Sequence, residues 1–360
     1  MNIEKRHELI LVINPGATST KFAIYDGENL IFKESIQHSV NDLQNFVHIF
    51  DQYPYRLELM ITSLQQHGIA LADVKAVVGR GGLLKPLAGG TYQINAAMVA
   101  DLKLAERGEH ASNLGAVMAF NIAQQLGILA YIVDPVSVDE LEPVARISGM
   151  PELPRVSLSH ALNMKAVARK AARLLGKAYE ESRLVIVHLG TGVSVSGHRY
   201  GRMIDVNNAM DEGPFSPDRC GGLPASQLAR LCYSGIYSYQ ELRRKISGQG
   251  GICSYLGTTD IREVEVRVQQ GDEQARLILE AFCYQVAKEI GAMATVLEGC
   301  VERIILTGGM AYSAGIVAEI TRRVEFIAQV LVLPGEEELE ALALGALRVL
   351  RREEEPQIYQ

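Results

Sequence analysis

Two arginines stand in settings that suit the binding of anions. Arg80 lies in VVGRGG and Arg219 in PDRCGG, so each is flanked by glycine or another small residue. Small neighbours let a planar guanidinium reach a ligand, and arginine favours paired hydrogen bonds to carboxylate or phosphate oxygens. An arginine in a glycine-rich loop is also commonly a solvated surface residue. The two positions therefore indicate an anion site only in combination with further motifs.

Two acidic residues are candidates for holding a cation. Asp134 directly follows the predicted strand 129–133, which places its carboxylate at the edge where open α/β sheets hold ligands. Glu337 stands in a run of three glutamates at the start of the predicted helix 337–350, where acidic residues also simply favour the helix dipole. Carboxylate oxygens suit Mg²⁺, which keeps several of its waters. We expect these carboxylates to support magnesium directly or through water.

A repeated pattern supplies the elements that must position such residues. An apolar strand, a polar residue, a Gly/Ser/Thr turn, a second strand and a closing glycine occur in Leu9–Gly27 and again in Leu184–Gly201. Backbone N–H groups of such turns can approach a phosphate closely. One turn alone would be ordinary punctuation between strands. Two at corresponding points predict an internally duplicated α/β protein that binds its ligand in the cleft between the halves.

Chain length and the positions of prolines predict where the two halves divide. At 360 residues the chain is long for a single core, and two domains are expected. Met150–Pro154 contains two prolines and reads as the linker. We therefore predict one domain over 1–150, completed by a C-terminal helix 337–352, and a second over 151–336.

Between these landmarks the pattern predicts a small number of further elements. Residues 41–68 read as a long helix interrupted at Pro54, and residues 274–297 as a long amphipathic helix. Residues 211–224 read as a loop that is dense in glycine and proline yet carries charges of both signs.

Composition excludes several classes of protein. The chain is 48% apolar and 21% charged, and no apolar run reaches the roughly 18 residues of a membrane span. The N-terminal MNIEKRHE lacks the layout of a signal peptide, and five cysteines without CxxC spacing read as reduced thiols. A net charge of −7 without a dense basic run argues against nucleic acid. We expect a cytoplasmic protein with neither membrane nor nucleic acid as partner.

Three motifs taken together carry a family resemblance. Asn14–Lys21 (NPGATSTK), His188–Gly192 (HLGTG) and Thr307–Gly309 (TGG) resemble the two phosphate loops and the adenosine motif of the actin, sugar-kinase and Hsp70 superfamily. Within it the chain resembles the acetokinase family of short-chain carboxylate kinases, with motifs from Asn14 to Glu338. The resemblance implies an α/β fold of two duplicated ribonuclease-H-like (actin-like ATPase) domains with an interdomain cleft, the second domain binding the nucleotide.

The resemblance also implies roles for the residues that match family motifs. Asn14 would contact the transferring phosphate, Arg80 and Arg219 match the active-site arginines, and Asp134 matches the catalytic aspartate. Glu337, together with Asp134, falls where the family holds magnesium. ATP and Mg²⁺ are the implied cofactors. The residues implied to bind the nucleotide are Ser19, Lys21, His188, Gly190, Gly192, Asp260, Arg262, Gly308 and Gly309.

One departure from the family pattern lies just after the predicted linker. Acetate kinase carries FHGTSH there, whereas this chain reads Arg155-Val156-Ser157-Leu158-Ser159-His160 and keeps only the final serine and histidine. Val156 thus stands where a histidine helps hold the phosphoryl group, so contacts with that group must be shared differently. The SLSH and DRCGG segments resemble the branch of the family that acts on butyrate.

The activity implied is the reversible, ATP-dependent phosphorylation of a short aliphatic carboxylate, butyrate or isobutyrate, to an acyl phosphate with release of ADP. A carboxylate is already ionised at neutral pH, so such a reaction barely needs a general base. The resemblance also implies a homodimer or higher homo-oligomer. Two alternatives remain: an ATPase switch of the actin or Hsp70 type, which would not need two loop arginines, and a sugar kinase, which would need an aspartate base.

Overall fold

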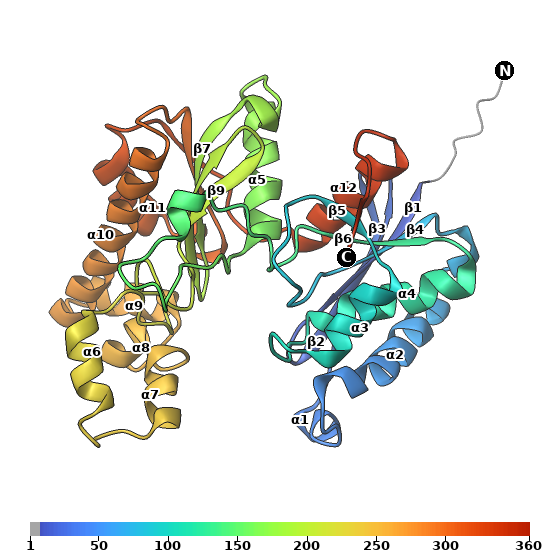
Figure 1. Cartoon of the computed structure of the whole chain (residues 1–360), viewed down its shortest axis with the longest axis horizontal. Coiled ribbons are helices and arrows are strands. Elements are labelled where there is room, and N and C mark those ends of the chain that lie inside the picture. Colours follow the sequence, from blue (N-terminus) through green and yellow to red (C-terminus); the bar gives the residue numbers. More distant parts are fainter. Residues whose placement is uncertain (1–7) are drawn as a thin grey trace. The chain divides into compact units, whose positions relative to one another are not determined.

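The computed structural model describes residues 8–360, and the chain divides into two compact units (Figure 1). The first unit comprises the described residues up to Val138 together with Glu337–Gln360, and the second comprises Asp139–Glu336. The chain therefore leaves the first unit ahead of the segment 150–154 predicted as the linker, and returns at the glutamate run. Apart from its final residue, the N-terminal MNIEKRHE lies outside the described residues.

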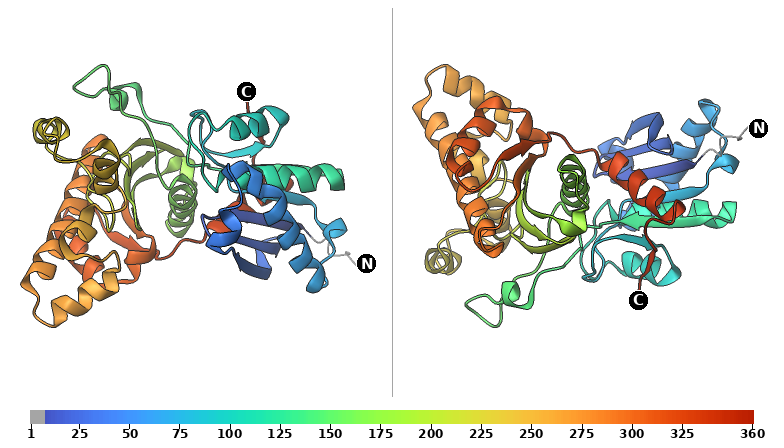
Figure 2. Two further views of the ribbon diagram at one scale, coloured as in Figure 1. Left: turned by 90° about the horizontal axis from the view of Figure 1, so that it is seen from below. Right: turned by 90° about the horizontal axis from the view of Figure 1, so that it is seen from above.

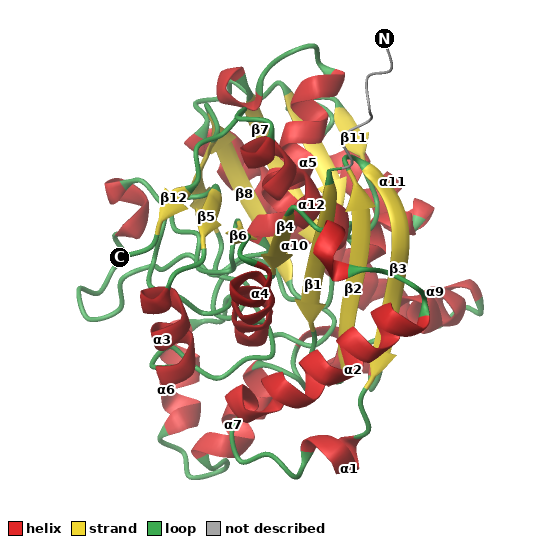
Figure 3. Cartoon of the chain, turned by 90° about the vertical axis from the view of Figure 1, so that its right-hand side faces the viewer, coloured by secondary structure: helices red, strands yellow, loops and turns green. Residues whose placement is uncertain are grey.

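A seven-stranded sheet forms the centre of the first unit, in the order β12-β5-β6-β4-β1-β2-β3. Neighbours β1, β2 and β3 pair antiparallel, whereas β4 runs parallel to β1 and β6 parallel to β4 (Figure 3). The strands are β1 (Leu9–Pro15), β2 (Ser19–Asp26), β3 (Asn29–Gln37), β4 (Ala76–Gly79), β5 (Thr91–Gln93), β6 (Leu129–Val133) and β12 (Gln357–Ile358).

Helices pack closely on this sheet. A Cβ at Gly79, the last residue of β4, would lie 2.1 Å from the carbonyl oxygen of Gly115, so both positions need glycine where helix and strand meet. The long helix predicted over 41–68 is wrong as one element, because it is divided and Pro54 lies in the first turn of α2. The helices and 3₁₀ turns are α1 (Val40–Leu43), η1 (Ile49–Gln52), α2 (Tyr53–Gln66), η2 (Leu71–Asp73), α3 (Ala96–Leu104), α4 (Asn113–Leu126) and α12 (Glu338–Leu350).

The second unit is built around a five-stranded sheet in the order β11-β10-β7-β8-β9. Strands β7, β8 and β9 pair antiparallel, while β10 runs parallel to β7 and β11 parallel to β10. The strands are β7 (Arg183–Leu189), β8 (Val193–Arg199), β9 (Arg202–Val206), β10 (Arg303–Thr307) and β11 (Val330–Val332).

Helices α5 and α10 cover opposite faces of this sheet, as the views along its edge show (Figure 2). Because both faces are covered, the inner strands are continuously apolar rather than alternating. The helices and 3₁₀ turns are η3 (Pro143–Arg146), α5 (Ala161–Leu174), η4 (Tyr179–Glu181), α6 (Ala225–Cys232), α7 (Tyr239–Ile246), α8 (Gly251–Leu256), α9 (Ile261–Gln269), α10 (Glu273–Val296), η5 (Gly309–Tyr312) and α11 (Ala314–Val324).

The two sheets share one plan. In each, three antiparallel strands are followed by two strands parallel to the first, giving β3-β2-β1-β4-β6 and β9-β8-β7-β10-β11. The internal duplication predicted from the two hairpins is confirmed. Among the described residues, no helix combines the length and apolar character needed to cross a membrane.

Candidate active site

In the first unit, the predicted residues Asn14 and Arg80 meet the side chain of Glu338 at the end of β1. Asn14 Nδ2 donates to Glu338 Oε2 at 2.7 Å, and Arg80 Nη1 lies 2.6 Å from Glu338 Oε1. Arg80 Nη1 also donates to Asn14 Oδ1 at 3.3 Å. The Arg80 side chain is 22% exposed, so it is screened from most of the solvent yet open to a ligand. The Arg80 guanidinium is thus paired with the Glu338 carboxylate through Nη1. Its Nε and Nη2 atoms have no partner among the described residues.

The sheet register explains why these residues meet. Ile13 on β1 lies opposite Gly79 on β4, so the next residues, Asn14 and Arg80, leave the two parallel strands side by side. The Arg80 N–H completes the ladder by donating to the Ile13 carbonyl at 2.8 Å. Glu338 is the first residue of α12, which packs on β1. Its carboxylate thus comes from the far end of the chain.

Other residues singled out in the first unit lie nearby on the same sheet. Asp134 is 1% exposed and its Oδ1 accepts from the Gly90 N–H at 2.7 Å. Lys21 stands opposite Asn14 in the antiparallel ladder, so both side chains project from the same face. Ser19 begins β2 after the turn. Glu337 is exposed and precedes α12, one position before the glutamate that pairs with Arg80.

His110 interacts electrostatically with Arg80 of the same cluster. Desolvation, with a smaller contribution from the Arg80 charge, lowers the pKa of His110. Its Nδ1 lies 2.7 Å from the Ser112 hydroxyl, which fixes the ring orientation. A neutral imidazole at this point can donate or accept a hydrogen bond without adding charge.

In the second unit, the end of β7 holds a pair of histidines. His188 is 1% exposed, and its ring stacks on that of His160 with centroids 3.9 Å apart and planes 13° from parallel. His160 Nδ1 lies 3.0 Å from the hydroxyl of Ser194, which stands opposite His188 on β8. His188 Nε2 lies 3.1 Å from Glu336 Oε1 without hydrogen-bond geometry. Both ring nitrogens of His188 are thus buried without a hydrogen-bond partner.

The glycines of the second turn make room for these side chains. A Cβ at Gly190 would lie 2.8 Å from His188 Nε2, and one at Gly192 would lie 2.4 Å from Arg219 Nη1. Arg219 itself donates from Nη1 to the Ala209 carbonyl at 3.1 Å, and its side chain is 21% exposed. The turn therefore brings the predicted arginine of the 211–224 loop against the predicted phosphate loop.

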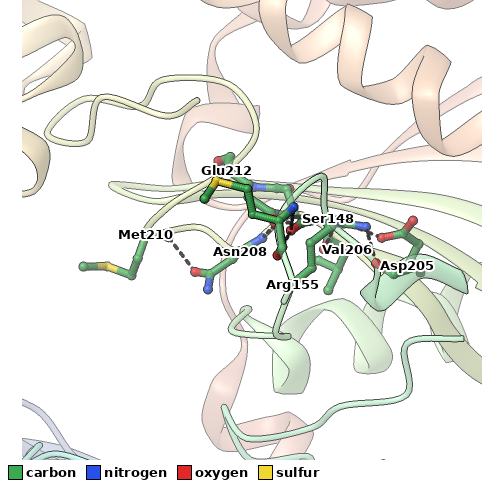
Figure 4. A network of polar contacts seen from close by, with 10 residues as sticks. Ser148, Arg155, Asp205, Val206, Asn208, Met210 and Glu212 are labelled. Atoms are coloured by element: carbon green, nitrogen blue, oxygen red, sulfur yellow. Dashed lines mark hydrogen bonds and ion pairs between the residues drawn. The ribbon is translucent and has the colours of Figure 1, made fainter. Parts of the chain in front are cut away.

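A charged network around Arg155 holds the backbone of residues 205–212 (Figure 4). Arg155 binds the Glu212 carboxylate with Nε–Oε1 and Nη2–Oε2 distances of 3.0 Å and lies 3.0 Å from Asp205. The Asn208 N–H donates to the same Glu212 carboxylate at 3.2 Å. These contacts fix the segment that presents the Ala209 carbonyl to Arg219. Val156, by contrast, is 52% exposed, so the departure from the family motif places no side chain in this network.

The TGG segment follows β10 and passes beside the second turn. Gly308 has φ +90°, and a Cβ there would lie 2.5 Å from the Leu189 carbonyl oxygen. Gly308 also exchanges two backbone hydrogen bonds with Gly335. Nothing lies within 4 Å of a Cβ built on Gly309. Gly308 is therefore required by packing, whereas Gly309 faces open space.

Asp260 and Arg262 stand apart from these clusters at the start of α9. Asp260 caps the helix by accepting from the Arg262 N–H at 2.9 Å, and its carboxylate binds the Arg262 guanidinium at 2.9 and 2.7 Å. This pairing lowers the pKa of Asp260 to about 2. Arg262 is 89% exposed, so a planar cation is presented to solvent.

Comparisons with known proteins identify the family and the fold. Residues 157–333 match the acetokinase family. Over 351 residues the chain is 52% identical to Butyrate kinase 1 of Clostridium acetobutylicum, covering 97% of this chain and 99% of that protein. The structure resembles acetate kinase of Porphyromonas gingivalis with a TM-score of 0.78 and 18% identity, covering 95% of this chain and 100% of that one. It also resembles a ROK family protein from Streptococcus pneumoniae TIGR4, with a TM-score of 0.53 and 12% identity over 96% and 100% of the two chains. The predicted class of two actin-like α/β domains is confirmed.

Proposed function

The chain belongs to the acetokinase family, and we propose that it transfers the terminal phosphoryl group of ATP to a short aliphatic carboxylate, with butyrate as the preferred acceptor. The observation that carries the proposal is 52% identity to Butyrate kinase 1 across nearly the whole of both chains. The alternatives, an ATPase switch and a sugar kinase, are not favoured by this likeness.

The two arginines suit the charge changes of this reaction. A carboxylate oxygen attacks the terminal phosphorus of ATP, the bond from that phosphorus to the bridging oxygen breaks, and the products are an acyl phosphate and ADP. No proton has to move, since the acceptor is ionised at neutral pH. Negative charge spreads over the phosphoryl oxygens during transfer. Arg80 in the first unit and Arg219 in the second each carry a guanidinium group of the kind that stabilises such charge.

Histidines and loop amides complete the phosphate-binding groups. His188, which has no hydrogen-bond partner at either nitrogen, can donate to a phosphate oxygen from the end of β7. At Gly309 nothing lies within 4 Å of a built Cβ, so the nucleotide can approach the backbone there without meeting a side chain. Gly190 and Gly192 instead leave room for His188 and Arg219, and we propose that these two side chains reach the phosphates from this turn. We propose that Ser19, Lys21, Asp260 and Arg262 also contact the nucleotide, as the family resemblance implies.

Magnesium fits the acidic residues of the first unit. Among residues 8–360, no three His, Cys, Asp or Glu side chains are grouped as a metal cluster. Mg²⁺ bound with nucleotides takes most ligands from phosphates and water, so one or two carboxylates suffice. We propose that Asp134 and the glutamate run hold the ion, Glu338 lying beside Arg80 where Glu337 does not. When bound, the ion would neutralise charge on the phosphate oxygens.

The substrate class can be tested by trapping the acyl phosphate with hydroxylamine. Purified enzyme is supplied with ATP and with linear acids from two to five carbons, with glucose, and without an acceptor. Turnover should rise from acetate to butyrate, because each buried methylene contributes about 0.8 kcal/mol, and fall once the tail exceeds its pocket. ATP consumption that is equal with and without acid would overturn the proposal, and so would phosphorylation of glucose alone.

We also propose that the chain associates with a second copy of itself. Helices α6 and α7 contain no buried residue. The large aromatic side chains of Tyr233, just after α6, and of Tyr239, in α7, are 93% and 78% exposed. Helices of eight residues are marginal without a covering surface. Residues 225–250 carry four basic side chains and one acidic one in a chain of net charge −7, which suits pairing with an acidic surface of another copy. Sedimentation of Tyr239→Glu against wild type tests this, and an unchanged mass would contradict it.

A further inference from the structure

A buried arginine outside the candidate site lies directly beneath the first turn. Arg56 on α2 is fully buried. Its Nη1 donates to the carbonyls of Gly16 and Ser19 at 2.9 and 3.1 Å, and its Nη2 donates to the Ala17 carbonyl at 3.0 Å. Gln52 accepts from Nε and Nη2 at 3.1 and 2.8 Å. All three nitrogens of the guanidinium are therefore engaged.

The charge of Arg56 is neutralised by no acidic side chain in the described part of the chain. Burial accordingly lowers the pKa of Arg56. A buried cation without a counter-ion is costly in free energy. Here the negative ends of three loop carbonyls take the place of a carboxylate. An apolar side chain would avoid the desolvation, but it would leave the Gly16 and Ala17 carbonyls without this donor, so Arg56 both pairs with these carbonyls and fixes their direction.

The carbonyl contacts dictate where the loop amides point. In a planar trans peptide the C=O and the following N–H point in opposite directions. With the Gly16 and Ala17 carbonyls directed at Arg56, the N–H groups of Ala17 and Thr18 point away from it. Both residues are exposed, and neither amide has a hydrogen-bond partner among residues 8–360. Successive free amides on a turn form a typical anion-binding group.

We propose that Arg56 is a positioning residue for the terminal phosphate of ATP. It holds the turn 15–19 with two amides directed outward, and it places a fixed positive charge behind them that favours an anion. This inference rests on the proposed function only for the identity of the anion. Nucleotide binding tests it without any acceptor, so it can fail independently of the substrate assignment.

The test compares ATP and ADP binding by calorimetry in wild type, Arg56→Met and Arg56→Lys. ADP lacks the terminal phosphate, so the ratio of the two dissociation constants reports on that group. Arg56→Met should bind ATP about tenfold more weakly while ADP binding stays within about twofold. Arg56→Lys keeps the charge but loses the planar fork, and should fall between.

Lys165→Met is the matched control, since Lys165 is a cation that is 1% exposed in the second unit and paired with Glu140 at 2.8 Å. It should lower the melting temperature and leave the ATP to ADP ratio unchanged. A wild-type ratio in folded Arg56→Met would overturn the proposal. If that variant does not fold, a wild-type ratio in Arg56→Lys overturns it instead.

Discussion

The end of β1 in the first unit and the end of β7 in the second occupy equivalent places in one strand plan, yet they carry different chemistry. Arg80 and Glu338 place full charges of opposite sign at the first, bridged by the neutral amide of Asn14. At the second, two stacked imidazoles stand beside a turn whose glycines leave room for neighbouring side chains. The shared strand order fixes where a side chain stands, and its type decides what it can bind.

The two turns are also held differently. The first turn is drawn onto the buried Arg56 cation by its carbonyls. In the second, the Thr191 carbonyl accepts from the neutral hydroxyl of Ser216, and Arg219 lies against Gly192 on the open side. One turn thus has its positive charge behind the backbone and the other beside it. We infer that equivalent turns can serve phosphate binding through different charge placements.

The largest expected effect concerns the two arginines, one in each unit. Arg80→Ala and Arg219→Ala should each lower acyl phosphate formation about a hundredfold, because a lost transition-state cation costs about 3 kcal/mol. Hydroxylamine trapping with butyrate measures the loss, and circular dichroism checks the fold. Near-wild-type turnover in one variant would assign the chemistry to the other unit and break the parallel between them.

A smaller effect separates the two glycines after β10. Gly308→Ala should destabilise the protein by about 2–3 kcal/mol, because its Cβ meets the Leu189 backbone and its φ is positive. Gly309→Val should leave stability unchanged and weaken ATP binding without altering carboxylate binding. Urea unfolding and calorimetry distinguish the two. Equal ATP affinity in folded Gly309→Val would remove this segment from the nucleotide site.

The smallest effect is a dependence of stability on pH that both units should share. Burial, followed by the Arg56 charge, lowers the pKa of His38 to about 4, and burial lowers that of His198 beside Lys165 and Arg169. The unfolded chain, with a histidine pKa of about 6.5, binds a proton that the native state does not. The free energy of unfolding should therefore fall as pH drops from about 6.5 to about 4.

Between pH 7 and pH 5, His38 alone should account for about 2 kcal/mol of this loss. His38→Gln and His198→Gln should each flatten the dependence, as measured by urea unfolding at both pH values. An unchanged slope in His38→Gln would show that its burial does not exclude the proton.

The sequence predicted those parts of the fold that rest on local periodicity. Both hairpins were recognisable because β-branched residues alternate on either side of a small-residue turn. Helices α6–α9 were not predicted, since short helices separated by glycine and serine give little periodic signal. The contact between Glu338 and Arg80 was not predicted, because a run of three glutamates does not reveal which of them the helix turns toward a neighbour. Arg56 was missed because its partners are backbone carbonyls, which leave no trace in residue types.

Because helix α12 belongs to the first unit, that unit can be completed only after the second unit has been synthesised. The helix supplies Glu338 to the first unit, yet the ribosome makes it after the whole second unit has been synthesised. Tyr359, one residue from the end, also bonds to Asp101 at 2.7 Å within that first unit. Domains generally fold as they emerge. We expect the second unit to fold during translation, while the first waits for the final residues, so a prematurely terminated chain would carry no assembled Arg80 site.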